Sequence, residues 1–231
     1  MDPHERLDAG EQAAREHRYD EALNHYIWFH EHALEHNEAL YGVRLSFALA
    51  SWAELGEMYP PALSMLKGIR DRKTAQLLLG EGDRHLFNDV SAINDHLHDQ
   101  EATYQLFVSL NRKFPDLAKS CASTAMPVLV QKRDYALARR FIQKPEEAIR
   151  SWSAALNKDL TDLDQKPPSH APVRDAYIRI YIDHVREILE TLSGTGETGE
   201  AAKLSQLAVD GLSARDARES VEVSLARLPL R

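Results

Sequence analysis

The residues with the clearest chemical potential stand in the string HALEH, from His32 to His36. A His-x-x-Glu-His string is typical of inverted zincins, in which two histidines one helical turn apart bind zinc while a glutamate activates water. At 100° per residue, His25, Trp28, His32 and His36 fall on one flank of a helix. No partner glutamate stands in a matching downstream helix, however, and eleven histidines make chance pairs common. A metal-dependent hydrolase using His32, Glu35 and His36 is therefore kept as an alternative.

The more conservative interpretation of Trp28, His32 and His36 is a surface stripe that packs on a neighbouring helix or on a partner protein.

The string GTGETG, from Gly194 to Gly199, fits a dinucleotide-binding fingerprint. That fingerprint works only after a strand, whereas this one follows a helical pattern, so we interpret it as a turn between helices. We expect no catalytic residues, no bound metal and no cofactor.

The composition describes a globular chain without a membrane span. Hydrophobic residues make up 43% of the 231 positions and charged residues 28%, and no apolar run reaches the 18 or so residues of a membrane helix. The start, MDPHERLDAG, lacks the basic and apolar regions of a secretory signal, which favours a cytoplasmic location. Cys121, the single cysteine, lies in an apolar helical stretch and is expected to be buried.

The negative charge lies in one half of the chain. Residues 1–115 hold 11 Lys and Arg against 19 Asp and Glu, whereas residues 116–231 hold 17 of each. An acidic surface repels phosphate backbones and attracts basic partners. The expected partner is therefore a protein or peptide with a basic surface, and neither a nucleic acid nor a membrane.

Three segments align without gaps at offsets of 40 residues: YDEALNHYI from Tyr19, YPPALSMLK from Tyr59 and DQEATYQLF from Asp99. Ala22, Ala62 and Ala102 superpose in this alignment. A small residue recurs where two helices of a hairpin must approach closely, which gives the pattern a physical reason.

The pattern resembles the tetratricopeptide repeat (TPR), in which an aromatic residue, a small residue and a bulky residue follow one another in the second helix. Tyr19, Ala22 and Tyr26 match it most closely, and Gly10 stands where the family has its first-helix glycine. The period is 40 rather than 34, the tryptophan of the first helix is missing, and the third unit begins with Asp99.

The resemblance implies that the first helix of each unit lines a binding groove. The positions that it assigns to this groove are His4, Leu7, Glu11, Ala14 and Arg15, then Arg44, Phe47, Ser51, Glu54 and Leu55, then Arg84, Phe87, Ser91, Asn94 and Asp95. Arginine recurs at positions 44 and 84, and phenylalanine at 47 and 87. An arginine beside an aromatic residue is typical of interface hot spots, although both phenylalanines also fit a core.

We predict an all-α fold, an α-α superhelix of TPR-like hairpins with a C-terminal helical extension. Apolar residues recur at helical spacing throughout, and Pro60, Pro61 and Pro115 stand where helices begin. The predicted parts are repeats over 1–115 (units near 2–37, 38–80 and 83–114), a divergent hairpin over 116–165 and capping helices over 172–231, with breaks at QKPPSHAP and SGTGETG.

The function expected from these patterns is a non-catalytic protein-interaction module. Its predicted partner-binding residues are the groove positions Arg44, Phe47, Ser51, Glu54, Arg84, Phe87, Asn94 and Asp95, together with Trp28, His32 and His36 on the flank. The alternative is a bacterial immunity protein, which neutralises a toxin by covering its basic cleft and so also binds a basic surface.

Overall fold

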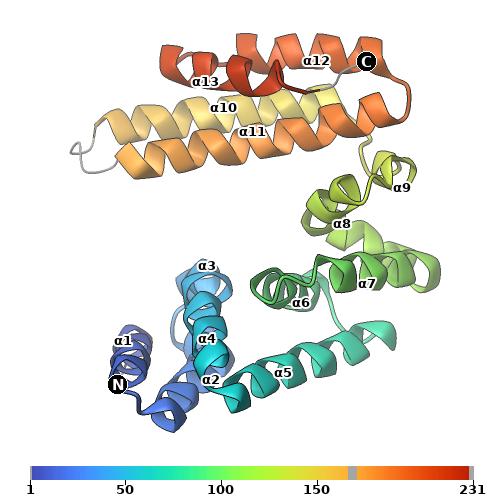
Figure 1. Cartoon of the computed structure of the whole chain (residues 1–231). Coiled ribbons are helices and arrows are strands. Elements are labelled where there is room, and N and C mark those ends of the chain that lie inside the picture. Colours follow the sequence, from blue (N-terminus) through green and yellow to red (C-terminus); the bar gives the residue numbers. More distant parts are fainter. Residues whose placement is uncertain (1, 166–170, 229–231) are drawn as a thin grey trace. The chain divides into compact units, whose positions relative to one another are not determined.

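The computed structural model describes residues 2–165 and 171–228, which form helices joined by short turns (Figure 1). No strand occurs within these two ranges, and the all-α prediction is confirmed. By its packing the chain divides into two compact units, Met1–Ala125 (unit 1) and Met126–Arg231 (unit 2).

The helices have the following bounds. Unit 1 contains α1 (Pro3–Arg15), α2 (Tyr19–His36), the 3₁₀ turn η1 (Glu38–Leu40), α3 (Tyr41–Leu45), α4 (Phe47–Met58), α5 (Pro60–Leu78), α6 (Arg84–His96) and α7 (Gln100–Lys113). The boundary between the units falls inside α8 (Pro115–Gln131). Unit 2 contains α9 (Tyr135–Arg139), α10 (Pro145–Asp164), α11 (Ala171–Gly194), α12 (Thr198–Asp210) and α13 (Arg215–Leu225). The predicted break at QKPPSHAP falls mostly on residues 166–170, which lie outside the described residues.

Several helices begin at residues that are favoured in the first turn of a helix. Asp2 accepts hydrogen bonds from the backbone N–H groups of His4 (2.7 Å) and Glu5 (3.2 Å), and the Glu5 carboxylate accepts one from the Asp2 N–H, which is a complete capping box. Proline opens α5 and α8 as predicted, at positions where a missing N–H group costs no hydrogen bond.

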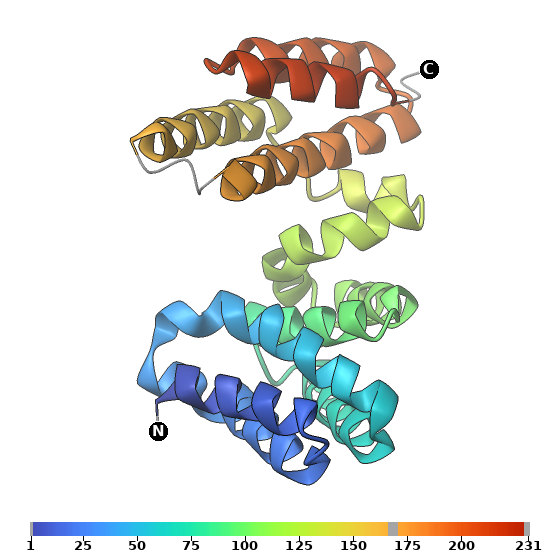
Figure 2. The ribbon, with the colours of Figure 1, turned by 60° about the vertical axis from the view of Figure 1, so that its left-hand side comes forward.

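Consecutive helices pack as adjacent pairs within each unit (Figure 2). In unit 1, α1 packs on α2, α4 on α5, α5 on α6 and α6 on α7. In unit 2, α10 packs on α11, α11 on α12 and α12 on α13. Gly10 shows why the first pair is close, since a Cβ atom there would lie 2.9 Å from Cε1 of Tyr26. Ala22 and Ala62 are fully buried in their pairs.

One type of turn recurs at the ends of these helices. His17, His98, Arg133 and Gly196 have φ angles of 60°, 55°, 57° and 87°, in the left-handed region. After each of them the next backbone N–H donates to a carbonyl five residues earlier, at 2.8–2.9 Å, which is the Schellman closure of a helix. Five positions after each turn residue stands a small buried side chain, at Ala22, Thr103, Ala138 and Ala201.

The recurring turn shifts the expected alignment in the third unit by one residue. Thr103 is 2% exposed and takes the place that the 40-residue offset assigned to Ala102, which is only partly buried. In unit 2 the equivalent turn at Gly196 separates α11 from α12, so GTGETG is a turn between helices, as interpreted from the sequence. Cys121 is fully buried, as predicted.

Each unit has its own apolar core. In unit 1 the core gathers large side chains from α2 and α4, among them Tyr26, Phe29 and Trp52. The indole Nε1–H of Trp52 donates to the carbonyl oxygen of Ala62 at 3.0 Å, so this large ring is buried with its polar atom satisfied. In unit 2 the hydroxyl of Tyr181 on α11 donates to the Ala208 carbonyl on α12 at 2.8 Å.

Candidate functional site

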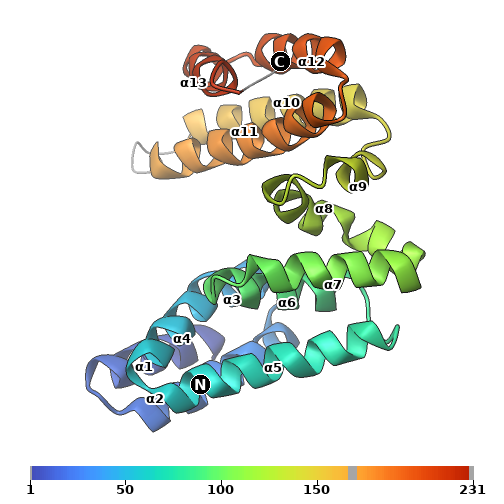
Figure 3. The same cartoon turned by 45° about the vertical axis from the view of Figure 1, so that its right-hand side comes forward.

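A groove opens between α1 and α4 in unit 1, where Figure 3 shows the two helices together with α2. It has a volume of about 410 Å³. Its lining, which we call the α1–α4 groove, consists of Glu11, Ala14, Arg15, His17, Tyr26, Ser51, Glu54, Leu55 and Met58. Six of these nine residues were assigned to a groove from the sequence. Among the predicted partner-binding residues, this groove brings Ser51 and Glu54 together.

Two carboxylates, Glu11 and Glu54, line this groove together with Arg15, which pairs with Glu11 at 3.7 Å. The hydroxyl of Ser51 donates to Oε1 of Glu11 at 3.5 Å, which joins the two helices across the groove. Burial, together with the nearby Glu11 carboxylate, raises the pKa of Tyr26 to about 12. Met58 is 55% exposed. The groove therefore has two carboxylates against one arginine, and Met58 is an adaptable apolar contact in its lining.

The two arginines of the predicted hot spot occupy different environments. Arg44 is 5% exposed on α3, whereas Arg84 is exposed at the start of α6. Phe47 and Phe87 differ in the opposite sense, because Phe47 is 71% exposed and Phe87 is fully buried, edge-on to Phe107 at 6.1 Å between ring centroids. The core interpretation thus holds for Phe87, and only Phe47 presents its ring to solvent.

Asn94 and Asp95, neighbours on α6, also differ in exposure. Asn94 is 1% exposed and donates from Nδ2 to the Thr103 hydroxyl at 3.0 Å, so it links α6 to α7 inside the unit. Asp95 is exposed. Of the third group of predicted groove positions, Arg84 and Asp95 are the ones with exposed side chains.

Arg44 belongs to a buried ion cluster formed with Asp89, Lys73 and His30. Arg44 donates to Oδ1 of Asp89 and Lys73 donates to Oδ2 of the same carboxylate. The imidazole of His30, 5% exposed, lies 3.2 Å from Nζ of Lys73 through its Nε2. These residues come from α2, α3, α5 and α6, so the cluster connects four elements of unit 1.

The cluster shifts the pKa values of its members in ways that follow from burial and charge. Burial alone would raise the pKa of Asp89, but the cations of Arg44 and Lys73 hold that pKa below its usual value. Burial also lowers the pKa of Lys73. For His30, burial and the two cations lower the pKa to about 3, so this imidazole is neutral near pH 7.

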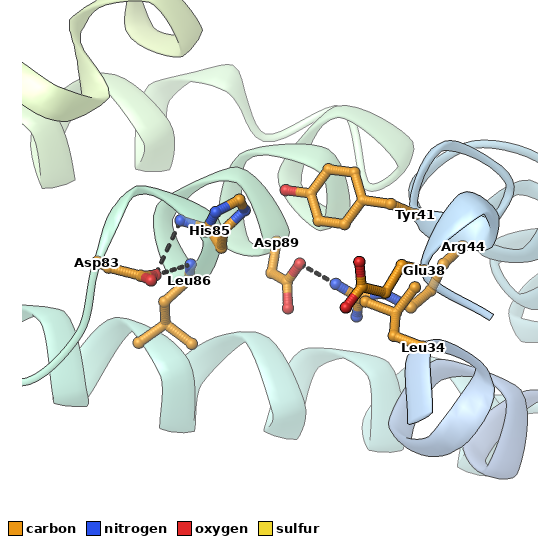
Figure 4. Close-up of a pocket in the computed structure, with 8 residues that line it drawn as sticks. All are labelled: Leu34, Glu38, Tyr41, Arg44, Asp83, His85, Leu86 and Asp89. Atoms are coloured by element: carbon orange, nitrogen blue, oxygen red, sulfur yellow. Dashed lines mark hydrogen bonds and ion pairs between the residues drawn. The ribbon is translucent and has the colours of Figure 1, made fainter. Parts of the chain in front are cut away.

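A second cavity, of about 650 Å³, adjoins this cluster (Figure 4). It is lined by Leu34, Glu38, Tyr41, Arg44, Asp83, His85, Leu86 and Asp89. Asp83 caps α6, accepting from the backbone N–H groups of His85 at 2.9 Å and Leu86 at 3.0 Å. Tyr41 meets the His85 ring edge-on, with 5.6 Å between the ring centroids.

The histidine and tryptophan flank of α2 packs mostly on itself. The Trp28 ring lies 5.6 Å from that of His32 and 5.5 Å from that of His36, and the guanidinium of Arg6 from α1 stands 4.8 Å over the indole. His32 Nδ1 pairs with Glu35 Oε1 at 3.2 Å. Among the described residues, no group of three or more His, Cys, Asp or Glu side chains is arranged to hold a metal ion.

The cluster residues Asp89, Lys73 and His30 were missed by sequence reasoning. A weak signal existed for two of them. Asp89 stands beside the apolar positions Phe87 and Val90 of its helix, and His30 follows Phe29 in an apolar run. A polar residue on a buried face implies a partner, but the spacing along the chain does not say which one.

Comparisons of the chain with protein-family models, with curated proteins and with solved structures found no significant match. Within the described residues, no helix is long and apolar enough to cross a membrane. The site must therefore be interpreted from its own geometry and charge.

Proposed function

We propose that this chain is a non-catalytic protein-interaction module, a TPR-like adaptor whose unit 1 binds a partner protein or peptide with a basic surface. The observation that carries the proposal is the α1–α4 groove, in which Glu11 and Glu54 from two helices flank one opening beside the exposed Met58. The packed helix pairs and their recurring turn support the repeat-like architecture.

The charge of unit 1 favours a basic partner. Residues 1–125 contain 12 Lys and Arg against 20 Asp and Glu, a net charge of −8, while residues 126–231 contain 16 of each. Complementary charge increases the rate of encounter and selects among partners, whereas apolar anchors supply much of the affinity. Phe47 and Met58, at the two ends of α4, are exposed apolar side chains available as such anchors.

A charge-reversal experiment tests this proposal. The double variant Glu11→Lys, Glu54→Lys reverses both carboxylates in the groove. Its matched control is Asp8→Lys, Glu57→Lys, which changes two exposed carboxylates of the same helices outside the groove lining. The net charge of the two variants is identical. Proteins captured by each full-length variant from cells of the source organism are compared by quantitative mass spectrometry.

The proposal predicts that basic proteins captured by the wild-type chain are lost with the groove variant and kept with the control. Equal loss with both variants would mean that overall charge, rather than the groove, drives capture. A captured toxin would identify the immunity form of the same function, and any other basic protein the adaptor form. If the two variants capture the same proteins as the wild type, the groove has no such role.

A further inference from the structure

A cavity of about 530 Å³ in unit 2 is lined by three arginines and one carboxylate. Arg133 lies in the turn after α8, Arg186 lies in the C-terminal half of α11, and Arg227 follows α13. All three residues are exposed, so their side chains are accessible to a ligand. Three separate helices therefore bring cations to one opening.

The charge of this lining is unbalanced. Glu190 is its one carboxylate and pairs with Arg186, with 3.2 Å between Oε1 and Nη2. Neither Arg133 nor Arg227 forms an ion pair with any of the described residues. Unit 2 as a whole contains equal numbers of basic and acidic residues, so the two unpaired cations are a local excess. Such a concave surface of one sign attracts ions of the opposite sign.

The ends of α8, α11 and α13 meet the same cavity, and helix C-termini attract arginine by their partial negative charge. The backbone itself engages carbonyl groups at these ends. The carbonyl oxygen of Leu129 accepts from Asp134 at 2.9 Å, and that of Leu192 accepts from Glu197 at 2.8 Å. The carbonyl oxygen of Leu225 also accepts a backbone N–H, at 3.0 Å. The guanidinium groups of Arg133 and Arg227 thus remain available to the oxygen atoms of a ligand.

Neutral side chains complete the cavity. The Tyr135 ring packs directly on Gly194, where an added Cβ atom would overlap the ring. Val130 and Leu228 add apolar surface to the lining. The volume is within the range of small-molecule pockets. The cavity therefore suits a ligand with an anionic group and an apolar body.

We infer that this cavity binds a small organic phosphate, a monoester whose phosphate group lies between Arg133 and Arg227. A phosphate monoester has a second pKa of about 6, so above pH 7 it is a dianion that matches the two unpaired cations. Its oxygen atoms accept hydrogen bonds from the planar guanidinium groups, a geometry that arginine favours. Its organic group lies against the ring of Tyr135.

This site and the proposed protein-binding function stand or fall separately. The α1–α4 groove belongs to unit 1, whereas every residue of the phosphate site belongs to unit 2. Loss of phosphate binding would leave the capture of a basic partner unchanged, and the reverse also holds.

Isothermal titration calorimetry of the full chain at pH 8 tests the inference with three probes. Phenyl phosphate is a dianionic ester, phenyl sulfate is its analogue with a single charge, and inorganic phosphate lacks the organic group. We expect saturable binding of phenyl phosphate, and binding of the other two that is at least about tenfold weaker. No saturable binding of phenyl phosphate at millimolar concentration overturns the inference, and so does equal binding of phenyl sulfate. Equal binding of inorganic phosphate would mean that the ligand is free phosphate and not an ester.

Variants locate the site. Arg133→Gln and Arg227→Gln each remove one unpaired cation and should weaken phenyl phosphate binding about tenfold. Arg179→Gln is the matched control, because Arg179 is an exposed arginine of α11 outside the lining. Glu190→Gln removes the one carboxylate of the lining and should tighten binding. Circular dichroism confirms that each variant folds. Weaker binding to Glu190→Gln, or equal weakening by Arg179→Gln and Arg227→Gln, would contradict the assignment.

Discussion

Arg44 is buried because a carboxylate 45 positions further along the chain neutralises it. The sequence predicted that Arg44 and Arg84 would share one environment, since they stand 40 residues apart. Arg44 donates instead to Asp89 in the interior of unit 1, and Arg84 remains exposed. Residue spacing identified Arg44 as a notable position, but it could not reveal Asp89, because a side-chain contact between α3 and α6 depends on how those helices pack.

Replacing each arginine with methionine should distinguish the two environments. Arg44→Met leaves Asp89 with only Lys73 as its cation, and removing one partner of a buried ion pair typically lowers the free energy of unfolding by about 3–5 kcal/mol. Arg84→Met changes an exposed side chain and should stay within about 0.5 kcal/mol of the wild type. Urea unfolding measures both, and equal effects would contradict the buried cluster.

His30 should make the folded protein less stable in mild acid. Burial and the cations of Lys73 and Arg44 lower its pKa from 6.5 to about 3, so between these values the unfolded chain binds a proton that the folded chain does not. This contribution lowers the free energy of unfolding as pH falls through that window, by about 2 kcal/mol between pH 7 and pH 5.

The variant His30→Gln keeps a side-chain acceptor and removes this titration. Its loss of stability between pH 7 and pH 5 should be about 2 kcal/mol smaller than that of the wild type, measured by urea unfolding at both values. The exposed His4→Gln is the control and should retain the wild-type difference. A His30→Gln variant with an unchanged pH dependence would mean that folding does not lower the pKa of His30.

At the scale of elements, a turn with a left-handed residue recurs after α1, α6, α8 and α11, and its backbone repeats more faithfully than the sequence spacing. His17, His98, Arg133 and Gly196 share a left-handed backbone, and each precedes a small buried residue by five positions. A gapless alignment selected Ala102, one residue before Thr103, because it matched residue types and could not detect a backbone angle. Helix type and approximate bounds were predictable from apolar periodicity, whereas the register of the third pair was not.

Substitutions at two equivalent turns should have opposite effects on stability. His98→Gly removes the steric cost of a left-handed backbone and should raise the free energy of unfolding by about 1 kcal/mol. Gly196→Ala introduces that steric cost at a position where a Cβ atom meets nothing within 4 Å. It should therefore lower the free energy of unfolding by about 1 kcal/mol. Thermal unfolding of both variants is the measurement, and changes of the same sign would contradict the turn assignment.

At the scale of the whole molecule, the net negative charge lies in one of the two packed units. The sequence placed the net negative charge in residues 1–115, and unit 1, which extends to Ala125, carries all of it. Six of the nine residues that line the α1–α4 groove stand at positions that the TPR resemblance assigned to a groove, with Glu11 and Ser51 related by the offset of 40 residues. The buried cluster and its cavity were not predictable, because four elements must assemble before His30, Lys73 and Asp89 meet.

The most direct test of the proposed function is the dissociation constant of the basic partner identified by capture, measured for the wild-type chain and both double variants. Reversing Glu11 and Glu54 should weaken binding at least about tenfold more than reversing Asp8 and Glu57, because only the first pair lines the groove. If the dissociation constants of the two double variants are equal, the partner responds to the net charge of the chain, and the α1–α4 groove is not its binding site.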